Sequence, residues 1–109
     1  MKLRLAVALI AAAYIVAFFS HAWHLQKTVY GDGVFYFSWL RSVVVDHDID
    51  FTNEYADSRV SQPNTPLGYA GNKYSIGPAV IWAPLYITVH QIVRGDGWSL
   101  PYQLAAGIT

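Results

Sequence analysis

The sequence predicts an all-α membrane protein with two transmembrane helices, an interfacial helix in the first external loop and the start of a third span. Two apolar runs, at about 3–23 and about 74–93, are each long enough to cross a bilayer, because a spanning helix needs about 20 mostly apolar residues. The composition agrees, since 54% of the 109 residues are hydrophobic and 13% are charged, about half of the roughly 25% that is usual in soluble domains.

The composition also argues against several kinds of partner and site. The formal net charge is zero, so no overall positive field predicts nucleic acid as a partner. Cysteine is absent, which excludes a disulfide framework and a cysteine metal site. The histidines have no metal-ligand spacing on one evident face, and we predict no metal site built from them.

The first apolar run follows a short basic start. Lys2 and Arg4 favour a cytoplasmic N-terminus, and Trp23 suits the opposite membrane interface. The same pattern fits a cleavable signal peptide, in which Ser20-His21-Ala22 would be the small-x-small cleavage site. We expect the helix to be retained, because a second membrane segment follows it.

The external loop, about 24–73, contains a short and very apolar helix at about 32–46. Nine of the twelve residues at 34–45 are apolar or aromatic. The exceptions have helical spacing i, i+3, i+4 and form one narrow polar stripe: Ser38, Arg41 and Ser42. A helix of this length cannot span a bilayer, so it lies in the interface or docks on neighbouring helices. A buried helix of a soluble domain is the alternative.

Asp32, at the start of this helix, has two compatible interpretations. A carboxylate there is a good helix cap, accepting from the free N–H groups of the first turn. Beside a membrane surface it would also serve as a general base toward a hydroxyl, or orient a cation beside a phosphate.

Residues 46–71 are polar and rich in turn residues, and we predict a loop. Asp46, Asp48 and Asp50 match positions 1, 3 and 5 of a calcium loop. The match then fails, because Phe51 replaces the glycine of position 6 and Asp57 replaces the bidentate glutamate of position 12. A solvated acidic turn is therefore expected, with contact to a divalent ion as the alternative.

The second apolar run is predicted to return to the cytoplasm. Pro84 should kink it, and Arg94 marks its cytoplasmic end. A turn follows, and 101–109 begins another apolar helix in which the sequence stops. We therefore expect an N-terminal fragment of a longer polytopic protein. On the external side, Arg41, Arg59 and Lys73 are candidates for phosphate contacts, and solvated side chains are the alternative.

Several motifs occur in a distinctive order. They read G-D-G-x-x-Y at 31–36, L-R-S at 40–42, D-x-D-x-D-F-x-N-E-Y at 46–55 and N-K-Y-S-I-G-P-A at 72–79. This order resembles the N-terminal part of bacterial multi-pass glycosyltransferases of the C-type superfamily, of the protein-mannosyltransferase-like and aminoarabinose-transferase-like kinds. The resemblance covers nearly the whole chain, but only about the first fifth of such a protein.

The resemblance implies an enzyme of the bacterial inner membrane that takes sugar from a polyprenyl-phosphate donor on the extracytoplasmic side. The catalytic or metal-orienting carboxylate of that family corresponds to Asp32, and a divalent cation is a possible cofactor. Tyr36, Arg41 and Lys73 are then candidate contacts to the donor phosphate or sugar. Gly33 stands where characterised members often carry glutamate. The fragment alone would be inactive.

The rival interpretation belongs to a different class of protein. In it, the chain is a small two-pass membrane protein that binds a partner through its external amphipathic helix. Further spans after Thr109 would favour the enzyme, and a stop codon there would favour the partner-binding protein.

Overall fold

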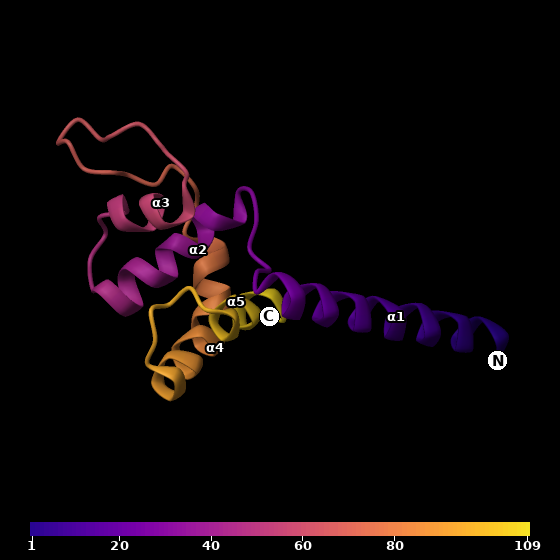
Figure 1. Cartoon of the computed structure of the whole chain (residues 1–109). Coiled ribbons are helices and arrows are strands. Elements are labelled where there is room, and N and C mark those ends of the chain that lie inside the picture. The colour runs from indigo at the N-terminus through magenta and orange to yellow at the C-terminus, as the bar shows by residue number, and fades with distance from the viewer.

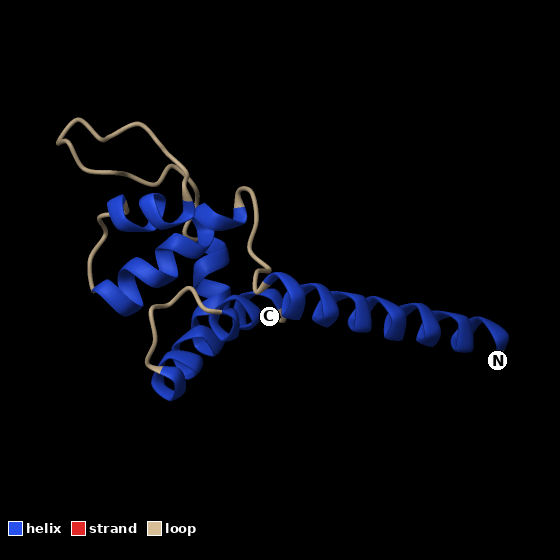
Figure 2. Cartoon of the chain, in the orientation of Figure 1, coloured by secondary structure: helices blue, strands red, loops and turns tan.

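The computed structural model describes all residues from 1 to 109 and consists of helices joined by loops, without strands (Figures 1 and 2). The elements are α1 (Lys2–Leu25), α2 (Gly33–Arg41), the π-helix η1 (Ser42–Asp46), α3 (Thr52–Ser58), α4 (Gly77–Val93) and α5 (Leu100–Gly107). The predicted all-α class is confirmed. The expected interfacial helix at 32–46 corresponds to α2 continued by η1.

Helix α1 extends away from the other elements, which gather around its C-terminal end (Figure 1). It has 24 residues, of which only Ala22 is buried, and it is the one helix long and apolar enough to cross a membrane. Its last turns contact α5, where a Cβ on Gly107 would come within 3.2 Å of Phe18. Most side chains of α1 are apolar and exposed, as they would be in a helix surrounded by lipid.

Helix α4 begins three residues later than the apolar run that predicted it. Its 17 residues measure about 26 Å, which is less than the roughly 30 Å of a bilayer core. Pro84 lies inside the helix and Pro78 near its start. The structure therefore does not show a second span, although one side of α4 exposes Val80, Ile81 and Ile92.

The main core lies where α2, α4 and α5 meet. Its buried members are Val29, Val34, Phe37, Leu40, Ala79, Tyr86, Tyr102 and Ala106. Phe37 and Tyr86 are fully buried with their ring centroids 5.5 Å apart in an edge-on arrangement. Burying one such side chain contributes about 1.5–3 kcal/mol. Helix α2 is thus docked on its neighbours, which was one of the two placements expected for it.

The prediction that residues 46–71 form only loop is wrong in one part, because 52–58 form α3. Phe51 and Tyr55, four residues apart, point to the same side and pack against Phe35 and Ala70 in a second small core. The ring of Phe51 also meets Trp39 edge-on at 4.8 Å. This packing against α2 stabilises a helix that is too short to be stable alone. The connection between α3 and α4 remains a long loop (Figure 2).

Candidate functional site

Asp32 is the N-cap residue of α2, but its side chain makes no capping hydrogen bond. The prediction that the Asp32 side chain caps this helix is therefore wrong. Asp32 already has helical backbone angles, and the N–H groups of Gly33 and Val34 donate to the carbonyls of Tyr30 and Gly31 at 3.0 and 3.1 Å. The exposed carboxylate instead accepts, at Oδ1, a hydrogen bond of 3.0 Å from the hydroxyl of Tyr74.

Tyr74 is held in place by contacts from α2 and from the preceding loop. Its ring stacks on Phe35 with the centroids 4.6 Å apart and an angle of 7° between the planes. Its backbone N–H donates to Oδ1 of Asn72 at 3.0 Å, and its carbonyl accepts from the indole of Trp39 at 3.0 Å. Asn72 is itself tied to α2, since its Nδ2 donates to the carbonyl of Phe35 at 2.6 Å. The phenol that binds Asp32 is therefore oriented before any ligand arrives.

Two further residues that the sequence singled out lie around Tyr74. The ring of Tyr36 meets Tyr74 edge-on at 5.3 Å, and Nζ of Lys73 lies 5.5 Å from the centre of the Tyr74 ring. A hollow of about 300 Å³ adjoins Lys73 and is lined by Gln62, Pro63, Thr65, Gly71, Asn72 and Lys73. Asp32, Tyr36, Lys73 and Tyr74 form what we call the Asp32 site.

The Asp32 site offers complementary groups for acid–base chemistry. The hydrogen bond to Asp32, followed by burial and by the charge of that carboxylate, raises the pKa of Tyr74, so the phenol stays protonated and donates. With Oδ1 bound, the other carboxylate oxygen remains for a proton or a cation, and the ammonium of Lys73 attracts an anion. Of the four site residues predicted from the sequence, the structure brings Asp32, Tyr36 and Lys73 together and leaves out Arg41. It adds Tyr74, whose role the sequence did not indicate.

Arg41 lies apart from the Asp32 site. It comes nine residues after Asp32, which corresponds to about 14 Å along a helix. Its Nη1 contacts Oδ2 of Asp46 at 2.6 Å and Oε1 of Glu54 at 2.9 Å. Its Nε donates to the carbonyl of Asp96 at 2.9 Å. Burial opposes the charged form, but the hydrogen bond to Glu54 and the charge of Asp46 outweigh it and raise the pKa of Arg41. Its guanidinium is thus occupied by protein groups.

Glu54 is the residue of this second group that the sequence did not distinguish from its acidic neighbours. Its side chain is fully buried, and Oε2 has no hydrogen-bond partner. Burial raises the pKa of Glu54 to about 7, although the hydrogen bond from Arg41 works in the opposite direction. The Arg41 cluster (Arg41, Asp46 and Glu54) therefore joins η1 to α3 through groups that a plain acidic loop would leave in solvent.

The remaining acidic residues of the loop serve local turns. Oδ1 of Asp48 accepts from the hydroxyl of Ser42 at 2.8 Å and from the N–H of Asp50 at 3.1 Å. Oδ1 of Asp50 accepts from the hydroxyl of Thr52 at 2.7 Å. No three histidine or acidic side chains are arranged to hold a metal ion.

Comparison with known proteins adds no relative to this picture. No protein-family model, curated protein or solved structure matches the chain.

Proposed function

We propose that this chain belongs to an inverting membrane glycosyltransferase that transfers a sugar from a polyprenyl-phosphate donor on the outer side of the bacterial cell membrane. The observation that carries the proposal is the state of Asp32. Its carboxylate is exposed, is free of any capping role, and is held at one oxygen by Tyr74. The motif order described above supplies the class of reaction.

The topology assigned to the protein follows the distribution of charge. In it α1 crosses the membrane, with Lys2 and Arg4 on the cytoplasmic side. Helix α4 stays on the outer side with α2, because Arg41 donates to the carbonyl of Asp96, two residues after Arg94. Asp32 follows the end of α1 by seven residues, which would keep the Asp32 site close to the lipid surface where a polyprenyl-phosphate donor is held.

In this reaction Asp32 acts as the general base, or as a group that orients a divalent cation. As a base it removes the proton of the acceptor hydroxyl while that oxygen forms the new bond to the anomeric carbon of the sugar. The bond from this carbon to the donor phosphate breaks, and the phosphate leaves with the electron pair. Lys73 would balance the negative charge of the phosphate, and Tyr74 fixes the direction of the carboxylate.

The rival, partner binding through the external helix, has less support. Five of the nine residues of α2 are buried within the chain. The apolar face that would bind a partner is thus covered by α4 and α5.

The decisive experiment replaces Asp32 in the full-length protein. In Asp32→Asn the amide oxygen still accepts from Tyr74, so the detergent-solubilised melting temperature should barely change. The variant removes the base, which typically contributes about 10²–10⁴-fold in rate. We expect transfer from a polyprenyl-phosphate sugar to fall at least about 100-fold. Near-normal transfer by both Asp32→Asn and Asp32→Ser would refute the assignment.

A further inference from the structure

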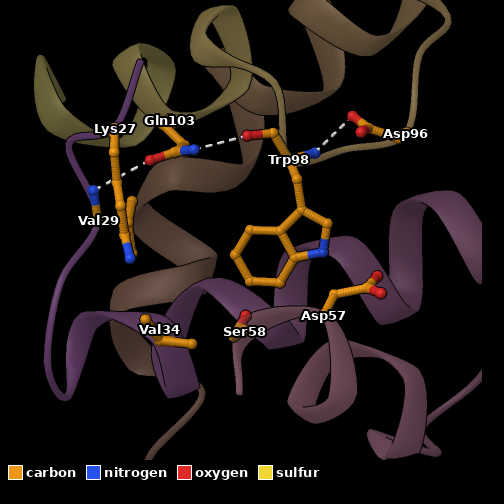
Figure 3. A pocket seen from close by; sticks show the side chains of 8 residues that line it. All are labelled: Lys27, Val29, Val34, Asp57, Ser58, Asp96, Trp98 and Gln103. Atoms are coloured by element: carbon orange, nitrogen blue, oxygen red, sulfur yellow. Dashed lines mark hydrogen bonds between the residues drawn. The ribbon is translucent and has the colours of Figure 1, made fainter. Parts of the chain in front are cut away.

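A second hollow lies on the opposite side of α2 from Asp32. Val34 contributes to its wall. Asp32 and Val34 are two positions apart, and side chains at that spacing on a helix point to nearly opposite sides. The hollow has a volume of about 370 Å³ and is lined by Lys27, Val29, Val34, Asp57, Ser58, Asp96, Trp98 and Gln103 (Figure 3). These residues come from the segment after α1, from α2, from α3, and from α5 and the loop before it.

The walls of this hollow are fixed by hydrogen bonds within the chain. Oε1 of Gln103 accepts from the N–H groups of Thr28 and Val29 at 2.9 and 3.1 Å, and its Nε2 donates to the carbonyl of Trp98 at 2.6 Å. Oδ1 of Asp96 accepts from the N–H of Trp98 at 2.9 Å. Gln103 and Asp96 therefore shape the hollow, and a ligand must use other groups.

One polar group of the hollow has no partner. Nε1 of Trp98 is buried and makes no hydrogen bond, which is rare for a buried donor in a folded protein. The indole nitrogen faces the carboxylate of Asp57, and no hydrogen bond joins the two (Figure 3). An unpaired donor beside a carboxylate calls for a group that accepts from one and donates to the other.

The chemistry of this pair restricts the ligand. A hydroxyl accepts from the indole N–H and donates to Asp57 at the same time, whereas an ammonium cannot accept and a carboxylate cannot donate. Lys27 lies at the other side of the hollow (Figure 3). Its Nζ is 5.0 Å from the centre of the Tyr30 ring, and its ammonium is a donor for a further ligand oxygen. Val29, Val34 and the indole ring offer apolar surface to C–H groups.

We propose that this hollow binds one sugar ring. Its volume is at the small end of ligand pockets, which span roughly 300–1,000 Å³, so it admits a single ring. The site is separate from the Asp32 site and does not depend on the transfer reaction. Sugars and the glycerol headgroups of lipids both have neighbouring hydroxyl groups. The experiment below distinguishes a sugar from a lipid headgroup.

The test follows the indole N–H of Trp98 itself by NMR, in full-length protein labelled with ¹⁵N-tryptophan and held in detergent. Trp98→Phe identifies the resonance. Methyl α-D-glucopyranoside and methyl α-D-mannopyranoside are the sugar probes, glycerol stands for the lipid headgroup, and glycine for a zwitterion. We expect a saturable shift of the Trp98 signal with at least one sugar. The Trp39 indole, already bonded to Tyr74, serves as the internal control and should not move.

Variants then test the paired groups. Asp57→Asn should weaken sugar binding at least about tenfold, because hydrogen bonds to a charged acceptor are the stronger ones. Asp48→Asn changes an exposed carboxylate outside the hollow and should leave binding unchanged. The proposal fails if neither sugar shifts the Trp98 signal, if glycerol or glycine binds as well as the sugars, or if Asp57→Asn binds like the unaltered protein.

Discussion

Glu54 should make the stability of this fold depend on pH near neutrality. Its carboxyl is fully buried, and burial raises its pKa to about 7. The charged groups that act on it, Arg41 and Asp46, lie at the end of α2 and in η1. With Glu54 protonated, the Arg41 cluster is neutral overall. With Glu54 ionised, it has a net negative charge in a buried position, which is costly.

The sign and the size of the effect follow from linkage. The folded state holds the proton more tightly than the unfolded chain, in which the pKa is near 4.5. Glu54 therefore contributes its full stability below about pH 4.5, and this contribution is lost as the pH rises through about 7. Each pKa unit corresponds to about 1.36 kcal/mol. Between about pH 5.5 and about pH 8.5, the free energy of unfolding should fall by up to about 2 kcal/mol.

The assay compares thermal unfolding of the detergent-solubilised protein with that of Glu54→Gln across this pH range. Glutamine keeps an oxygen for Arg41 and adds N–H donors, so the variant should lose the decline and be the more stable protein at pH 8.5. Asp57→Asn, in which an exposed carboxylate of α3 is replaced, should keep the decline. Parallel profiles for the unaltered protein and Glu54→Gln would refute the argument, because Glu54 would then be ionised throughout.

Three further predictions address the Asp32 site and the topology. Tyr74→Phe removes the hydroxyl that holds Asp32 but keeps the ring on Phe35, so transfer should fall several-fold with little change in melting temperature, whereas Tyr36→Phe should leave Asp32 oriented. A cysteine placed at Ser61 should react with an impermeant maleimide in intact cells, and labelling only after lysis would reverse the topology. Mass analysis should find the N-terminus intact, and a mature start at Trp23 would identify a signal peptide.

The limits of the helices were predictable where local chemistry decides them. Gly31 and Gly33 around Asp32 mark the start of a helix, and the run of polar residues after Val45 marks its end, so 32–46 was found almost to the residue. The continuous apolar side chains of α1 needed no tertiary contact to be recognised. Helix α3 was missed because its stability comes from the packing of Phe51 and Tyr55 on Phe35, which no local pattern in 46–71 reveals.

The roles of the charged residues were harder to predict, because they depend on partners distant in sequence. Tyr74 lies 42 residues from the carboxylate that it binds, and only the fold brings them together. Arg41 and Lys73 looked equivalent as external cations near a phosphate. Asp46 and Glu54, five and thirteen residues after Arg41, occupy its guanidinium, while Lys73 stays exposed beside Tyr74. Of the two, Lys73 is therefore the cation that can meet an anionic donor without first breaking a buried ion pair.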